Sequence, residues 1–229
     1  MNIPEILPHE AAKEYALRVL KKNIITLELQ PGSQISENEL SSALSLSRTP
    51  IREALAELAK VKLIEIVPQK RTSISLIDYD LVEEASFMRY TMESAVIERV
   101  CQLRTEQDLI CLEENIALQK VYFQNGLKDR LFEKDNEFHR AFFEMTHNLE
   151  IFQLMQNLEV HFDRVRSLFV NNIQELGIVE EHEAIVQGIK NRDAAYTKAQ
   201  LQAHLNRYKV DATELQRRFP DYFRAESAL

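Results

Sequence analysis

Residues 46–55 read Leu-Ser-Arg-Thr-Pro-Ile-Arg-Glu-Ala-Leu, and this stretch decides how the surrounding chain is interpreted. The apolar residues in it and just after it recur at helical spacing, which predicts a helix over about 48–60. Pro50 falls in the first turn of that helix, where its missing N–H costs nothing. Either Ser47 or Thr49 is expected to cap the helix.

The same helix has a basic face. Arg48 and Arg52 are four residues apart and therefore lie on one side, opposite the apolar side. A helix that enters the major groove of DNA needs hydrogen-bond donors near its N-terminus, and either arginine could pair with the edge of a guanine. Ser47 and Thr49 could reach phosphates. Two arginines at this spacing are by themselves more typical of a solvated helix face, so the interpretation depends on the neighbouring elements.

Those neighbours complete a winged helix-turn-helix. Before the central helix, Pro31-Gly32 ends a helix predicted from about 10 to 29, and Ser36 and Glu39 form a capping box for a short helix that reaches 43 or 44. After it, two β-rich segments at 63–67 and 72–76 enclose the basic tip Lys70-Arg71. Three helices and a hairpin with a basic tip are typical of a DNA-binding domain, which we place at residues 1–77.

From residue 78 to 229 every segment has helical character, so the chain is predicted to be mainly α. The expected helices lie near 79–102, 105–125, 128–146, 148–171, 178–190 and 192–217. Residues 1–77 carry a net charge of +1, whereas the remainder carries −9. The acidic remainder is therefore not expected to lie along a phosphate backbone, which leaves that role to the first domain.

Composition sets the class of protein. The chain has 229 residues, 45% of them hydrophobic, which suffices for two domains with real cores. No apolar run approaches the ~18 residues of a membrane span, and the first residues lack the features of a signal peptide. The two cysteines, Cys101 and Cys111, have no metal or redox spacing and indicate core or surface thiols in a reducing compartment. A cytoplasmic location is the expectation.

Histidines concentrate in the helical region. Asp135 and His139 are four residues apart on one predicted helix, while His182 and His204 lie on two later helices. Helices that each contribute one or two ligands to a bundle core can build a metal site, and three imidazoles with one carboxylate suit zinc, nickel, iron or manganese. A single interior histidine is more often a hydrogen-bonded core residue, so spacing alone leaves this open.

The sequence also resembles a known family. Gln30-Pro31-Gly32-Ser33, Glu39-Leu40 and residues 46–55 closely resemble the N-terminal domain of GntR-family bacterial regulators. The resemblance implies that Arg48 and Arg52 read bases, with Ser47 and Thr49 on the DNA backbone. Asn38 stands where the family often has a basic residue, and we include it among the DNA-binding candidates. The wing lacks the usual glycine, with Thr72 near its place, so Lys70 and Arg71 are expected to supply its contacts.

The helical region resembles the FCD domain of the FadR-type subfamily. The matching segments are Arg89-x-x-x-Glu93, Asp135-x-x-Phe138-His139, Glu181-His182-x-x-Ile185 and His204-Leu205. The resemblance implies an antiparallel six- or seven-helix bundle over 78–229. It also implies a divalent metal, with zinc first, held by Asp135, His139, His182 and His204. Arg89 would then pair with the carboxylate of a small organic acid, unless it forms a salt bridge with Glu93 instead.

These patterns predict a ligand-responsive transcription regulator, and a repressor in particular. A homodimer would place two recognition helices on a near-palindromic operator in double-stranded DNA. One alternative keeps the regulator but gives it a metal-free pocket for a bulkier effector such as an acyl-thioester. Two remote alternatives are a metal-dependent hydrolase, for which no general base has motif-level support, and a protein–protein adaptor that binds no DNA.

Overall fold

The computed structural model describes residues 1–67, 70–172 and 177–225, without side-chain detail at 171–172 and 208–213. The chain divides into two compact units. The first comprises Met1–Val82, Val160–Leu168 and the chain from Glu214 on, and the second comprises Glu83–Glu159 and Phe169–Thr213. Among the described helices, none combines the length and apolar character needed to cross a bilayer.

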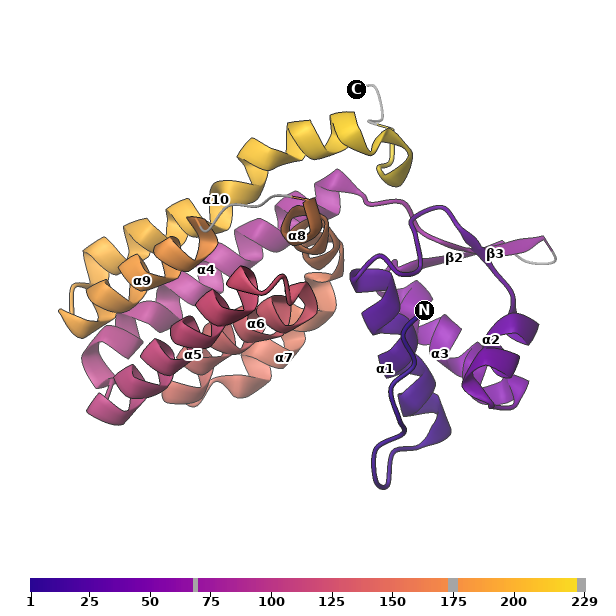
Figure 1. Ribbon diagram of the computed structural model, residues 1–229, viewed down its shortest axis with the longest axis horizontal. Helices are drawn as coiled ribbons and strands as arrows, with labels where there is room; N and C mark the ends of the chain where they lie inside the picture. Colours follow the sequence, from indigo (N-terminus) through magenta and orange to yellow (C-terminus); the bar gives the residue numbers. More distant parts are fainter. Residues whose placement is uncertain (68–69, 173–176, 226–229) are drawn as a thin grey trace. The chain divides into compact units, whose positions relative to one another are not determined.

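The first unit contains a winged helix (Figure 1). Its elements in chain order are α1 (Ala12–Ile25), β1 (Gln34–Ile35), α2 (Glu37–Leu44), α3 (Arg48–Lys60), β2 (Ile64–Val67) and β3 (Arg71–Ile74). The strands form an antiparallel sheet of order β1-β3-β2, with Gln34 opposite Ser73 and Ile64 opposite Ile74. The two-residue strand β1 was not predicted, because two residues carry no alternation that a pattern can detect.

Local sequence explains the turn between α2 and α3. Ser36 caps α2 by accepting a hydrogen bond from the Glu39 backbone N–H at 3.2 Å, and Ser45 closes the helix in a left-handed conformation. α3 runs from Arg48 to Lys60 as predicted, and Ser47 occupies its N-cap position. The Ser47 side chain makes no cap hydrogen bond there, and Thr49, the other expected cap, lies inside the helix. The apolar side of α3 is buried in the core of the winged helix, through Ile51, Ala54, Leu55 and Leu58.

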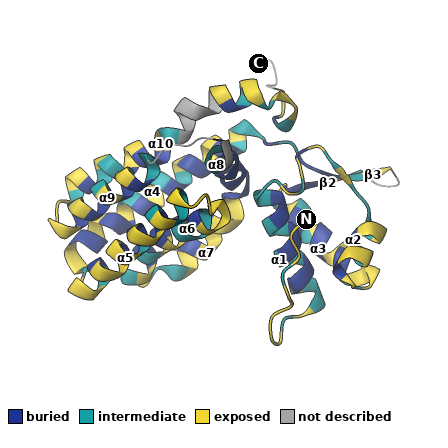
Figure 2. Cartoon of the chain, viewed as in Figure 1, coloured by how far each residue is buried: buried dark blue, intermediate teal, exposed yellow. Residues whose placement is uncertain are grey.

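Seven helices follow the wing in the part of the chain that the structure describes. They are α4 (Tyr79–Leu103), α5 (Glu106–Gln124), α6 (Lys128–Met145), α7 (Leu149–Leu158), α8 (Val160–Asn172), α9 (Gly177–Lys190) and α10 (Ala194–Arg218), before a 3₁₀ turn at Pro220–Tyr222. Figure 2 shows their buried residues on the sides that face neighbouring helices. This arrangement confirms the predicted class, a winged helix-turn-helix followed by a helical bundle.

One predicted helix is wrong. The segment expected as a single helix over 148–171 is broken at Glu159, where the backbone turns between α7 and α8. The break has a physical reason. Phe152 and Met155 before it belong to the core of the second unit, whereas Val160 directly after it belongs to the core of the winged helix. Helical periodicity shows that apolar residues share one side of a helix. It cannot show that the residues before and after Glu159 pack into different cores.

Hydrogen bonds join the start of α8 to the chain around the winged helix. His161 is 2% exposed; its Nδ1 accepts the backbone N–H of Asp78 at 3.1 Å, and its Nε2 donates to the Lys62 carbonyl at 3.0 Å. Arg164 is fully buried and donates to the Ser75 carbonyl at 2.7 Å. His161 is therefore a buried hydrogen-bonding residue of the first unit.

Candidate functional site

The N-terminal half of α3 presents polar side chains to solvent. Ser47, Arg48, Thr49 and Arg52 are all exposed, on the side of the helix opposite its buried apolar residues. Arg52 donates from Nε to the Glu37 carboxylate on α2 at 2.7 Å. The structure thus brings together the four candidates that the sequence placed on this helix.

Two further groups of DNA-binding candidates lie on the same unit. Asn38 is exposed in the first turn of α2. Lys70 and Arg71 are exposed at the tip of the wing, where the Lys70 backbone N–H bonds the Val67 carbonyl at 3.1 Å. Arg71 begins β3 opposite Val67. Both wing side chains are therefore available to a phosphate backbone.

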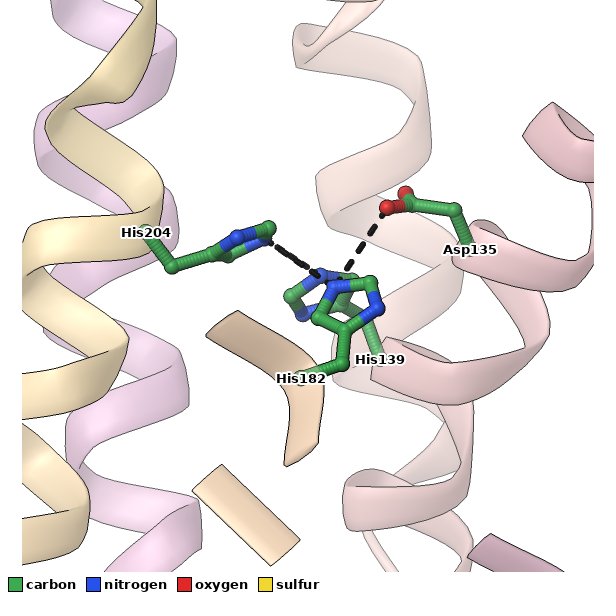
Figure 3. Close-up of side chains that lie close together, drawn as sticks. All are labelled: Asp135, His139, His182 and His204. Atoms are coloured by element: carbon green, nitrogen blue, oxygen red, sulfur yellow. Dashed lines mark hydrogen bonds and ion pairs between the residues drawn. The ribbon is translucent and has the colours of Figure 1, made fainter. Parts of the chain in front are cut away.

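The four metal-ligand candidates converge in the core of the second unit (Figure 3). Asp135 and His139 come from α6, His182 from α9 and His204 from α10. All four are buried, and one ligand atom from each lies within 4.8 Å of the others. The Nε2 atom of His204 is 3.2 Å from that of His139 and 3.3 Å from that of His182, and the latter is 3.5 Å from an oxygen of Asp135.

The outer nitrogens of the three imidazoles each meet an oxygen acceptor. The Nδ1 atoms lie 2.6 Å from a Glu93 carboxylate oxygen for His139, 2.8 Å from the Gln119 amide oxygen for His182 and 2.9 Å from a Glu181 carboxylate oxygen for His204. In a neutral imidazole such an acceptor holds the proton at Nδ1 and leaves a lone pair at Nε2. Three lone pairs then face one another beside a carboxylate, which is the donor set of a divalent metal site.

Two family models match the chain. The FCD domain matches residues 84–207, and the model for bacterial regulatory proteins of the gntR family matches residues 13–74. The chain belongs to the GntR family and carries an FCD domain. The FCD match includes all four metal-ligand candidates and ends within α10, and the gntR match runs from the second residue of α1 to the end of β3. Since the members of this family regulate transcription, the chain is a transcription regulator and not an enzyme.

Known proteins resemble the regulator over nearly its whole length. The HTH-type transcriptional repressor RspR of Escherichia coli (strain K12) is 27% identical over 224 residues, which are 97% of this chain and 98% of RspR. The gluconate operon transcriptional repressor of Bacillus licheniformis is 26% identical over 180 residues, 76% of this chain and 74% of that repressor. The solved structure of E. coli McbR/YncC superposes with a TM-score of 0.76 at 18% identity, covering 92% and 99% of the two chains, which shows a shared fold.

Arg89 of the regulator lies beside the cluster of metal-ligand candidates but is already engaged. Its Nε donates to Glu93 at 2.6 Å, and the two side chains are 3% and 0% exposed. Burial opposes the ionisation of Glu93, but its partners His139 and Arg89 hold the pKa of its carboxyl well below the usual range. Burial, reinforced by the charge of Arg89, lowers the pKa of His139 and favours the neutral imidazole that a metal ligand requires. Arg89 thus forms the salt bridge with Glu93 that was expected as the alternative to a contact with an effector carboxylate.

A second network supports His204. Glu181 accepts from Arg207 at 2.6 Å while its other oxygen bonds His204, and the Arg207 guanidinium lies 5.4 Å from the centre of the Phe169 ring. Gly177, which begins α9, makes room for this arrangement, because a Cβ there would clash with the guanidinium of Arg207. Burial raises the pKa of Glu181 against the lowering influence of Arg207.

These supporting residues were largely missed in the sequence. Gln119 carries no recognisable signal, since an isolated glutamine on a helix is normally a surface residue. Glu181 and Arg207 were visible only as neighbours of ligand candidates, one residue before His182 and three after His204. His147, another histidine of the second unit, lies outside the cluster of ligand candidates and is exposed after the end of α6 with a positive φ.

Proposed function

We propose that the regulator is a repressor that binds a near-palindromic operator as a homodimer and responds to a small carboxylic acid held at a metal in its FCD domain. Residues 1–77 would bind the DNA, and residues 78–229 would bind the effector and form the dimer. The exposed arginines of α3 support the first assignment. The repressor names of two relatives, RspR and the gluconate operon repressor, support the sign of regulation.

The convergence of three Nε2 atoms carries the metal assignment. The Nε2 atom of His204 lies 3.2 Å from that of His139 and 3.3 Å from that of His182, and without a cation their lone pairs would repel one another. Asp135 adds a carboxylate oxygen 3.5 Å from the Nε2 atom of His182. His139, His182, His204 and Asp135 would hold zinc, with nickel, iron or manganese as alternatives. Such an ion supplies a Lewis-acidic positive charge that can bind an effector carboxylate directly.

The side chains around the cluster would complete effector recognition. Arg89 is proposed as the cation that meets the carboxylic acid, because a guanidinium binds carboxylates through paired hydrogen bonds. The effector would then share Arg89 with Glu93. Such competition links effector binding to His139, since Glu93 also bonds that imidazole. An effector can change DNA affinity only if it binds the DNA-competent and the DNA-incompetent states unequally.

A thermal-shift screen of organic acids tests this proposal. Gluconate is the first acid to include, since a relative is named for a gluconate operon. An acid at 100 times its dissociation constant should stabilise the metal-loaded chain by ~2.7 kcal/mol and have no effect after chelation. The same acid should change the affinity of the metal-loaded chain for promoter DNA, and it should not change that of the chelated chain. Equal acid binding by loaded and chelated protein would contradict the metal-centred proposal and favour the metal-free pocket.

A further inference from the structure

The contact between Glu37 and Arg52 links the two helices of the helix-turn-helix. Glu37 is the first residue of α2 and Arg52 lies in the second turn of α3. Their side chains are 34% and 63% exposed, and the carboxylate accepts from Nε at 2.7 Å. Within the described residues this is the hydrogen bond that the structure gives the Arg52 side chain.

The turn between the helices holds this pair in place. Ser41 donates from its hydroxyl to the Leu46 carbonyl at 2.5 Å, and the Leu46 backbone N–H returns a bond to the Ser41 carbonyl at 3.1 Å. Ser36 fixes the start of α2 directly before Glu37. The position of the Glu37 backbone relative to α3 is therefore set by three short-range hydrogen bonds, each of which involves a backbone group.

The atom that Glu37 engages matters for base recognition. A guanidinium carries five N–H donors in one plane, and the contact with a guanine edge uses two of them. Glu37 engages the donor at Nε, which leaves the N–H groups of the two terminal nitrogens for a guanine edge. Fixing the plane beforehand also reduces the side-chain entropy lost on binding.

We infer that Glu37 is a positioning residue that determines specificity, because it orients the Arg52 guanidinium toward one base of the operator. This inference rests on the proposed role of Arg52 as a base reader. Its negative charge has a cost, because a carboxylate near the duplex repels phosphates whatever the sequence. Glu37 therefore lowers the affinity for all DNA while it raises discrimination at one position. An ion pair without an orienting role would change the affinity for all DNA and leave the discrimination at that position unchanged.

The test is selection from a pool of random duplex DNA with the full-length chain and its variants. Arg52→Ala should abolish the preference at one base position in each half-site. Glu37→Ala should weaken the same preference about tenfold, while it raises the affinity for a scrambled duplex at low salt. Glu39→Ala is the matched control: it removes the same charge from the same helical turn, raises scrambled-duplex affinity similarly and leaves the base preference intact.

A third variant separates orientation from charge. Glu37→Gln keeps an oxygen acceptor for Nε without the charge, so it should retain most of the base preference and still gain affinity for the scrambled duplex. An unchanged preference in Glu37→Ala, with that position lost in Arg52→Ala, would overturn the inference and leave Arg52 as a reader. A full preference in Arg52→Ala would remove Arg52 from the readers, and the inference with it.

Discussion

The Nε2 atoms of His139 and His204 lie 3.2 Å apart in the core of the FCD domain, and the Nδ1 atom of each ring bonds a carboxylate. A direct hydrogen bond between the two Nε2 atoms would require an additional proton on one ring, which burial disfavours. The proposed divalent cation would resolve the conflict, because it would accept both lone pairs. This relationship motivates the first two predictions.

Removing the metal should destabilise the regulator. A metal present at 100 times its dissociation constant contributes ~2.7 kcal/mol, which corresponds to roughly 5–10 °C in the melting temperature of a chain of this size. Calorimetry before and after chelation, and again after zinc is restored, measures the effect. Identical melting of all three samples would show that the four side chains do not hold a metal in the folded protein.

The Gln119 amide oxygen, which accepts from Nδ1 of His182, should increase the affinity for the metal. Replacing Gln119 by leucine removes the acceptor from Nδ1 and leaves the four ligands in place. Loss of such a supporting bond typically weakens metal binding 10- to 100-fold. Competition with a coloured chelator measures the affinity, and Gln124→Leu, at an exposed position of the same helix, provides the control. Equal weakening in both variants would point to a general effect of leucine on α5.

Arg48 should contribute base-specific binding, unlike the wing. Arg48→Ala is expected to cost about 1–3 kcal/mol on a selected operator and little on a scrambled one. Lys70→Ala should weaken both sequences alike and reduce the salt dependence by about one counterion. Fluorescence anisotropy at several salt concentrations distinguishes the two patterns, with Arg130→Ala, exposed on α6, as control. A uniform loss in Arg48→Ala would place that residue on phosphates instead.

His161 should make stability depend on pH. Burial, with the nearby charge of Arg164, lowers the pKa of His161 to about 4 from an ordinary value of 6.5. Between these two pKa values His161 binds a proton in the unfolded chain but not in the folded one. The free energy of unfolding is therefore highest above pH 6.5 and decreases as the pH falls toward 4. The loss should reach roughly 3 kcal/mol.

Urea unfolding of the metal-free protein at several pH values measures this dependence, with His161→Gln as the reference that lacks the titrating group. Both proteins keep the same ligand histidines, so the difference between their pH profiles isolates His161. Parallel profiles would mean that His161 is as easily protonated in the folded chain as in the unfolded one.

Local signals explain what the sequence could predict. Pro50 and the apolar spacing after it located α3, since both act within one helix. The spacing of Asp135 and His139 likewise placed two ligand candidates on one face of α6. Gln119 and Arg207 could not be predicted from spacing, because their roles arise from contacts between residues 63 and 26 positions apart in the chain. The break at Glu159 was missed for a similar reason, namely that the two adjoining helices serve different cores.

The most direct test of the metal-centred account is the metal content of the purified chain, measured by elemental analysis in parallel with His182→Ala and His147→Asn. His147 lies outside the cluster, and asparagine tolerates its positive φ. The account predicts about one divalent ion per chain in the wild type and in His147→Asn, and a large loss in a folded His182→Ala. Full occupancy in His182→Ala, or no metal in the wild type after purification with added zinc, would contradict it.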